Sequence, residues 1–332
     1  MHPIRRLGHR VADAMVLGAF RMTLHPWLQK QVDRLALAPK MEDVGHVYVR
    51  ANELAFYARI QPREVAAVEE RVIPGPRRPI RLRIYRADTA PHQPMIVFFH
   101  GSGFVICSLD THDGLCRALC LAGRATVISV DYALAPEQPF PAAPDECEAA
   151  TRWVFDNAAE LGGQPDRIAL CGDSAGGALA VVTARRLRDT GGPQPVALLL
   201  FYPVAAYPDA MFASWIERGE GYGLDASTMR WFWGHYLTDP EKQATSPDAA
   251  PLRTASFAGF PPAYVTTAEF DILRDEGEAL AARLEAEGGG AVLVRYPDMN
   301  HGFQAWVGLL DRADEAMAAA GSWLKARMAD AG

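Results

Sequence analysis

Long apolar runs and a surplus of positive charge are both missing from this sequence of 332 residues. No stretch reaches the roughly 18 consecutive apolar residues that a membrane-spanning helix needs, so no stable membrane insertion is expected. Acidic residues outnumber basic ones by 40 to 33, giving a net charge of −7 and a pI near 5.7. Because nucleic acids bind clustered lysine and arginine side chains, nucleic acid is not an expected partner.

The sequence also lacks a paired or metal-type arrangement of cysteines. It has an odd number, five: Cys107, Cys116, Cys120, Cys147 and Cys171. The two that lie four residues apart fit packing on one face of a helix better than a metal site. Because reduced thiols are typical of intracellular proteins, the cysteines predict a cytoplasmic location.

A clean secretory signal is missing at the N-terminus. Three arginines precede the apolar stretch 11–20, as in a short signal peptide, but Asp13 interrupts it. No small-residue cleavage site follows before Trp27. The better interpretation is an amphipathic helix whose apolar face holds Val11, Ala14, Met15 and Gly18.

Strand-like and helix-like segments alternate along most of the chain, without internal repeats or a disordered linker. This alternation predicts an α/β fold with a mostly parallel sheet covered by helices on both faces. The predicted strands are 65–73, 80–87, 95–99, 126–132, 168–171, 197–202, 263–268 and 291–295. The predicted helices include 111–122, 142–161, 276–287 and 313–329.

Ser174 lies at the apex of a predicted strand–turn–helix unit, after the apolar strand 168–171 and before a helical pattern from Ala178. Gly172 and Gly176, two residues to either side, remove the Cβ atoms that would block so sharp a turn. Such a turn lifts the hydroxyl out of the sheet, where a base can reach it. A glycine–serine turn alone can be purely structural, but the strand and helix around it favour a nucleophile.

A nucleophilic serine needs a base, and in α/β-hydrolases the histidine follows it in the chain. Only His235 and His301 lie downstream of Ser174. His235 lies at helical spacing among aromatic residues, where a half-buried structural role is the better interpretation. His301 follows the predicted strand 291–295 in a turn-rich stretch, where open α/β sheets place their chemistry, so it is the predicted base.

The acid that orients the base should follow the strand 263–268, where Glu269, Asp271 and Asp275 compete. Asp271 falls in the predicted strand-to-helix loop and is favoured. Asp275 is better placed as a helix N-cap, and Glu269 is better placed at the end of the strand.

Donors for an oxyanion are predicted upstream. The apolar strand 95–99 runs into His100-Gly101-Ser102-Gly103-Phe104, whose small residues let backbone N–H groups face a carbonyl oxygen. The N–H of Ala175, just after the nucleophile, would add a donor. A plain glycine-rich turn is the alternative, but the segment occupies the expected place before the nucleophile.

Together these blocks resemble the hormone-sensitive lipase family (bacterial family IV) of α/β-hydrolase carboxylesterases. The matching blocks are His100–Phe104, Tyr132–Ala142 (YALAPEQPFPA), Gly172–Gly177 (GDSAGG), Asp271–Leu273 and His301–Phe303 (HGF), over about residues 80 to 305. The resemblance implies an α/β-hydrolase fold with a helical cap. It also implies Ser174 as nucleophile, Asp271 as acid and His301 as base, with oxyanion donors from Ser102, Gly103 and Ala175.

The sequence departs from the family pattern at four positions. Ser102 replaces the third residue of His-Gly-Gly-Gly, which keeps the backbone donor if the local φ angle suits a residue with a Cβ. Ile272 replaces the proline of Asp-Pro-Leu, Ala133 stands where a basic residue is frequent, and Ala178 where asparagine is frequent. None of these changes removes a catalytic group, and activity is expected to be retained.

The strand–helix alternation stops between Pro203 and Pro262, where an aromatic-rich helical insertion is broken by Gly219, Gly221 and Gly223. The resemblance implies that residues 1–50 and 205–245 form the cap, and that 51–204 and 246–332 form the two parts of the hydrolase core. An aromatic cluster at helical spacing is more often core than binding site. An insertion over the active-site face nevertheless predicts a substrate contact from at least one of Phe212, Trp231 and Trp233. Phe104, in the predicted oxyanion loop, is a further candidate for substrate binding.

The predicted function is hydrolysis of short- to medium-chain carboxylic esters through an acyl-enzyme, with no metal and no organic cofactor. The partner is a small-molecule ester, and a homodimer is left open. One alternative is a non-catalytic ligand receptor on a hydrolase scaffold, which the presence of all three triad residues disfavours. A second is an acyltransferase or lactonase that uses the same residues.

Overall fold

The computed structural model describes residues 22–88, 90 and 93–330, so the predicted helix around 11–18 lies outside the described residues. Its centre is an eight-stranded sheet in the order β1-β2-β4-β3-β5-β6-β7-β8. The strands are β1 (Ala67–Ile73), β2 (Ile80–Arg86), β3 (Gln93–Phe99), β4 (Thr126–Val130), β5 (Gly163–Asp173), β6 (Leu198–Phe201), β7 (Ala263–Phe270) and β8 (Ala291–Asn300). This is the α/β-hydrolase fold that the sequence predicts.

The sheet is mostly parallel. Only β2 breaks the pattern, since it pairs antiparallel with both β1 and β4. The other neighbours, from β4 through β3, β5, β6 and β7 to β8, are all parallel. Apolar strands such as β7, in which all eight residues are buried, suit a sheet that is covered on both faces.

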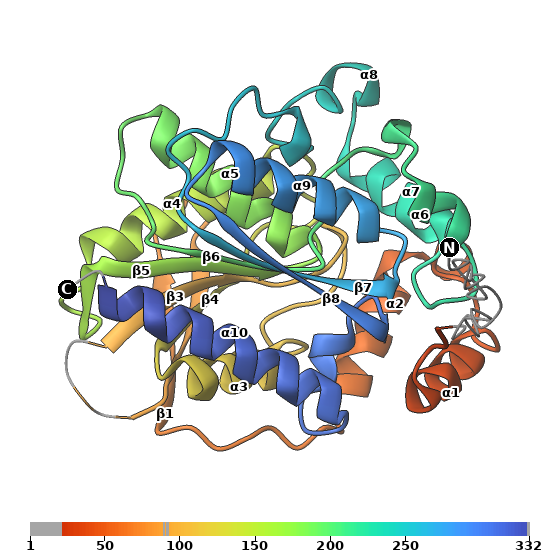
Figure 1. Ribbon diagram of the computed structural model, residues 1–332, viewed down its shortest axis with the longest axis horizontal. Coiled ribbons are helices and arrows are strands. Elements are labelled where there is room, and N and C mark those ends of the chain that lie inside the picture. The colour runs from red at the N-terminus through yellow and green to blue at the C-terminus, as the bar shows by residue number, and fades with distance from the viewer. Residues whose placement is uncertain (1–21, 89, 91–92, 331–332) are drawn as a thin grey trace, which may run out of the picture.

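Helices cover both faces of the sheet. Figure 1 shows α4 (Ala142–Asp156), α5 (Ala175–Asp189) and α9 (Arg274–Glu287) on one face, and α3 (Asp113–Gly123) and α10 (Asp311–Asp330) on the other. Each face has its own apolar core. The layers hold the strands in a fixed register, and the loops at the strand ends are therefore held in place.

Several strand ends differ from the prediction, and two of these differences bear on the site. β7 continues to Phe270 and β8 to Asn300, because the two strands keep pairing past a bulge between Ala268 and Phe270 until Phe270 faces Asn300. The stretch 296–300, predicted as a turn, is therefore strand. Asp271 and His301 follow directly on neighbouring strands, which brings both side chains to the same edge of the sheet.

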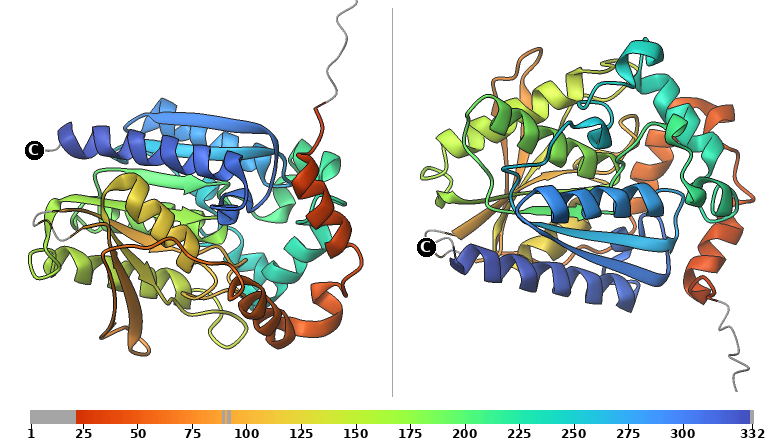
Figure 2. Two further views of the ribbon diagram at one scale, coloured as in Figure 1. Left: turned by 90° about the horizontal axis from the view of Figure 1, so that it is seen from below. Right: turned by 45° about the horizontal axis from the view of Figure 1, so that its top comes forward.

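Two pairs of helices, far apart in the sequence, meet at one end of the sheet. They are α1 (Pro26–Leu35) with α2 (Met41–Tyr57), and α6 (Ala213–Glu217) with α7 (Ala226–Tyr236). Figure 2 shows the two pairs side by side, and α2 contacts α7. α2 continues past the predicted segment end at residue 50. None of the helices in the described ranges is both long and apolar enough to cross a membrane.

Candidate active site

Ser174 occupies the sharp turn between β5 and α5, with the left-handed φ of 52° that such a turn imposes. Its backbone is fixed by a hydrogen bond from its N–H to the Phe201 carbonyl oxygen at 2.8 Å. A Cβ on Gly172 would lie 2.2 Å from Gly176 backbone atoms, and one on Gly176 would lie 1.9 Å from the Phe99 carbonyl oxygen. Both glycines are therefore required for the turn, as their spacing predicts.

Three side chains from three strand ends form one hydrogen-bonded chain. His301 Nε2 lies 2.9 Å from Ser174 Oγ, and His301 Nδ1 lies 2.8 Å from Asp271 Oδ2. The Asp271 carboxylate is fully buried, and its other oxygen accepts the Leu273 N–H at 2.8 Å. A carboxylate held from both sides in this way fixes the imidazole ring in one orientation. The structure thus brings together the three residues singled out as nucleophile, base and acid.

The competing acids have other partners. Glu269 lies in β7, and its carboxylate accepts hydrogen bonds from Arg218, Arg274 and Arg295 at 2.9 to 3.2 Å. Asp275 is not the N-cap of α9, because the helix already begins at Arg274. Its carboxylate instead accepts the Ser214 N–H at 2.8 Å.

The remaining histidine downstream of the serine also has another environment. His235 lies on α7, edge-on to Trp231 with ring centroids 4.6 Å apart. It therefore has the aromatic surroundings that its spacing in the sequence indicates.

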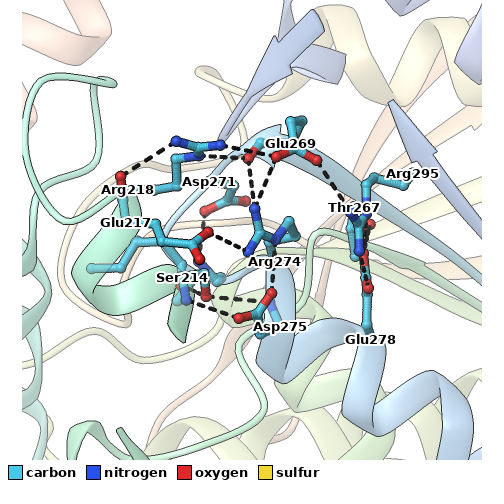
Figure 3. Close-up of polar contacts among 12 residues, drawn as sticks. Ser214, Glu217, Arg218, Thr267, Glu269, Asp271, Arg274, Asp275, Glu278 and Arg295 are labelled. Atoms are coloured by element: carbon cyan, nitrogen blue, oxygen red, sulfur yellow. Dashed lines mark hydrogen bonds and ion pairs between the residues drawn. The ribbon is translucent and has the colours of Figure 1, made fainter. Parts of the chain in front are cut away.

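The loop that carries Asp271 is tied to α6 by a network of charges (Figure 3). Arg274 donates to Glu217 at the end of α6 at 2.9 Å, and Arg218 donates to the Glu269 carbonyl oxygen at 3.1 Å. Ser214 Oγ donates to the Ile272 carbonyl oxygen at 2.7 Å. The position of the acid loop therefore depends on the insertion as well as on the sheet.

Backbone N–H groups near Ser174 are left without acceptors. In the part of the chain that the structure describes, the N–H groups of Ser102, Gly103 and Ala175 donate to no protein atom. Ser102 does not have a positive φ, so its Cβ causes no backbone strain. Gly103 does have one, +54°, and a Cβ there would lie 2.3 Å from the Phe232 ring. The third position of the motif thus accepts serine, whereas the fourth requires glycine.

The Ser102 side chain has a structural role of its own. Its hydroxyl lies 2.7 Å from the Tyr132 hydroxyl and accepts the Phe104 N–H at 2.8 Å. Tyr132 in turn donates to the His100 carbonyl oxygen at 2.6 Å. Because all of these groups are buried, the hydrogen bonds hold loop 100–104 in one conformation.

A buried carboxylate and two histidines lie behind this loop. Asp173 Oδ1 accepts the Gly101 N–H at 2.7 Å, and its Oδ2 lies 3.4 Å from His112 Nε2. Burial favours a high pKa for Asp173, but His112 and the Gly101 amide outweigh it and lower the pKa below the ordinary value. Burial, with His112 nearby, lowers the pKa of His100 to about 3. His100 is therefore neutral at ordinary pH.

A cavity of about 600 Å³ opens beside Ser174 and His301. Its apolar lining comes from both helix pairs and includes Leu28, Val32, Met41, Phe56, Leu224, Met229, Phe232 and Trp306. A volume in this range suits a small organic ligand. The cavity also contains Ser102, Gly103 and the Glu53 side chain.

The four aromatic residues predicted to contact substrate do not line this cavity. Phe104 is buried and stacks on Tyr236 with ring centroids 3.9 Å apart. Trp233 is buried between Phe104 and Tyr207, while Phe212 and Trp231 pack against the same apolar core. The helical spacing of Trp231 and Trp233 on α7 therefore reflects packing, the more frequent meaning of such aromatic clusters.

The resemblance predicts a cap from residues 1–50, but no residue of α1 or α2 was predicted to line the cavity. The signal available was weak: Glu53, Phe56 and Tyr57 fall at positions i, i+3 and i+4 of one helix. Only the fold shows that this helix face meets residues more than 100 positions away. Within the described residues, no group of three or more potential ligands is arranged to hold a metal ion.

Comparison with known proteins agrees with this geometry. Residues 96–305 match the model of a protein family that is described as having the α/β hydrolase fold. The chain is 40% identical over 301 residues to Esterase LipI of Mycobacterium tuberculosis, covering 88% of this chain and 92% of that protein. It is 42% identical over 225 residues to Carboxylesterase NlhH of the same organism, covering 67% and 70%.

A solved structure gives the same result. An α/β-hydrolase enzyme from the metagenome of Lake Arreo, Spain, superposes with a TM-score of 0.88 at 36% identity, covering 92% of this chain and 99% of the other. The motifs, the sheet order and these similarities agree. The chain therefore belongs to the hormone-sensitive lipase family of α/β-hydrolase carboxylesterases, bacterial family IV.

Proposed function

We propose that this protein is a serine carboxylesterase that cleaves short- to medium-chain esters through an acyl-enzyme. The observation that carries the proposal is the hydrogen-bonded chain from Ser174 through His301 to the buried Asp271, next to a cavity of about 600 Å³. Among the described residues that line this cavity, no other nucleophile is in contact with a base.

The reaction proceeds in two halves. His301 Nε2 accepts the Ser174 proton as Oγ attacks the ester carbonyl carbon, and the Asp271 carboxylate stabilises the imidazolium that forms. The tetrahedral intermediate collapses when His301 gives the proton to the departing alcohol. A water molecule, deprotonated by the same imidazole, then attacks the acyl-enzyme and releases the acid.

The negative charge on the carbonyl oxygen needs donors that are already in place. The N–H groups of Ser102, Gly103 and Ala175 support that role, because they donate to no described protein atom. Ser102 and Gly103 line the cavity with Ser174, and Ala175 follows Ser174 at the start of α5. Loss of one such donor typically costs about 10² to 10³ in kcat.

The size of the cavity supports short to medium acyl chains. A small ester fits into about 600 Å³, whereas most of a long-chain triglyceride would remain in water. Residues 1–50 and 205–245 are proposed as the cap, because α1, α2 and α7 contribute much of the apolar lining.

The test is hydrolysis of p-nitrophenyl esters from acetate to palmitate by the wild type and by Ser174→Ala. We expect rates that peak at short or medium chains and that fall at least about 10³-fold in the variant. No hydrolysis of any ester by the folded wild type, or equal rates in Ser174→Ala, would refute the proposal.

The cytoplasmic location and a homodimer remain proposals. All five cysteines are free thiols, which supports a reducing compartment. β8 is an edge strand with Val292 and Leu293 exposed, which supports pairing with a second copy. Fractionation of the cells and light scattering of the purified protein would test these two proposals.

A further inference from the structure

One carboxylate in the cavity is not needed by the reaction. Glu53, on α2, lines the same cavity as Ser174 and His301. Within the described ranges of the chain, no hydrogen bond or ion pair engages its side chain. The other acid that lines the cavity, Asp173, is engaged by Gly101 and His112. Asp271, which does not line it, is engaged by His301 and Leu273. Glu53 is therefore an acceptor without a partner.

The Glu53 carboxylate is half-buried, so it has lost part of its contact with water without gaining a protein partner in the described residues. Burial raises its pKa, and His112 offsets only part of that effect. Its oxygens are not among the polar atoms sealed from solvent, so a ligand can reach them. A carboxylate that has lost part of its hydration attracts a cation more strongly than a fully exposed one does.

Aromatic rings lie on the same side of the cavity. Phe56 and Tyr57 follow Glu53 at i+3 and i+4 on α2, so the three side chains share one helix face. Both rings pack against Trp306, with centroids 5.4 and 6.5 Å apart, and all three line the cavity. Aromatic faces next to a carboxylate are the groups that bind quaternary ammonium ions.

The histidines that line the cavity, His112 and His301, each have a carboxylate partner. The arginines that line it lie toward the solvent. Arg34 and Arg59 also line the cavity, but both are exposed, and Arg34 is bonded to Gln31. The remaining wall is largely apolar. The ligand that matches this cavity is therefore amphiphilic, with an apolar body and one positive group.

We propose that Glu53, together with the rings of Phe56, Tyr57 and Trp306, binds a cationic ammonium group of the ester substrate. This inference rests on the proposed esterase activity and adds a substrate class to it. Glu53 is a specificity-determining residue, and it has no part in the bond-making steps.

Two pairs of isosteric esters test the proposal, one for each side of the ester bond. The first is butyrylcholine with 3,3-dimethylbutyl butyrate. The second is the phenyl ester of 4-(trimethylammonio)butyrate with phenyl 5,5-dimethylhexanoate. The readout is the cation-to-neutral ratio of kcat/KM within each pair, for the wild type, Glu53→Gln, Phe56→Leu and the control Asp43→Asn, an exposed acid on the same helix.

We expect Glu53→Gln to lower the ratio about tenfold in at least one pair, which corresponds to about 1.4 kcal/mol. Phe56→Leu should lower the same ratio by a smaller factor, and Asp43→Asn should leave it unchanged. A fall of less than about threefold in both pairs for Glu53→Gln, or an equal fall for Asp43→Asn, overturns the inference. p-Nitrophenyl butyrate separates the two proposals: if it is hydrolysed while the ratios stay constant, only the assignment of Glu53 fails.

Discussion

Two neighbouring residues of loop 100–104, Ser102 and Gly103, differ in what their backbone permits. Ser102 has a φ that suits any residue, whereas Gly103 has a φ of +54° and lies against the buried Phe232 ring. The sequence motif places glycine at both positions and therefore does not distinguish them. The distinction leads to one prediction for each residue.

Gly103→Ala should reduce kcat more than about a hundredfold, because the added methyl group would displace either Phe232 or the backbone donor. Steady-state kinetics with p-nitrophenyl butyrate, on protein with an unchanged circular dichroism spectrum, measures the loss. If the clash with the ring is the cause, the double change Gly103→Ala with Phe232→Ala should recover part of the activity. Near-normal activity in the single variant would contradict this explanation.

Ser102→Ala should lower stability by about 1 to 3 kcal/mol and kcat by less than about tenfold. The change leaves the Phe104 N–H buried without its acceptor, but it keeps the backbone donor of residue 102. Ser102→Gly should likewise keep most of the activity, with a modest shift in rate or acyl preference. Urea denaturation and kinetics measure the two effects, and loss of essentially all activity in either variant would show that the hydroxyl is catalytic.

Among the elements, α2 is held to the core mainly by the hydrogen bonds of one side chain, Arg50. Arg50 donates to the carbonyl oxygens of Val105 and Ala135 at 2.8 and 2.9 Å, and to both oxygens of Glu137 at 2.7 and 2.8 Å. These hydrogen bonds from Arg50 are the main reason that the pKa of Glu137 is lowered to about 2. Since α2 also carries Glu53 and Phe56, Arg50 fixes one wall of the cavity.

Arg50→Ala should therefore raise KM for p-nitrophenyl butyrate by about three- to tenfold, with a smaller effect on kcat. The triad lies on other elements and keeps its geometry. Arg71→Ala is the control, because Arg71 makes a comparable ion pair with Glu160 on the surface. A fall in kcat with no change in KM would show that α2 acts on the triad and not on the cavity wall.

At the scale of the whole molecule, Glu276 joins the insertion to the core. Its fully buried carboxylate accepts the N–H groups of Ala205 and Ala206 at 2.8 and 3.1 Å and the Trp215 indole N–H at 3.1 Å. Burial raises its pKa from the ordinary 4.5 to about 7, although the three donors oppose the shift. Between those two values the folded protein holds a proton that the unfolded chain has lost.

The stability that depends on a protonated Glu276 should therefore be present in full below pH 4.5 and be lost as the pH rises through about 7. The free energy of unfolding should fall by up to about 3 kcal/mol between pH 5 and pH 8 on this account. Glu276→Gln, which cannot ionise, should lack the fall. Urea denaturation of the wild type and of Glu276→Gln at pH 5 and pH 8 measures the free energy of unfolding. If this free energy falls by the same amount from pH 5 to pH 8 in both proteins, the assignment to Glu276 is contradicted.

Local motifs were enough to predict the fold, the family and the three side chains that form the hydrogen-bonded chain. Ser174, Asp271 and His301 each follow a strand, and a parallel sheet brings such ends together. The residues that line the cavity could not be predicted from the sequence, because they depend on how α1 and α2 pack against distant elements. The aromatic insertion was misleading for the same reason, since Trp231 and Trp233 pack with the apolar core instead of lining the cavity.

The order of the strands along the chain also determines when the candidate active site becomes complete during synthesis. Ser174 and loop 100–104 leave the ribosome early, whereas His301 follows β8, the last strand of the chain and an edge of the sheet. A nascent chain can therefore complete the nucleophile turn long before it has a base. Ester hydrolysis on a translating ribosome would thus begin only after β8 has docked, which makes activity a late marker of complete folding.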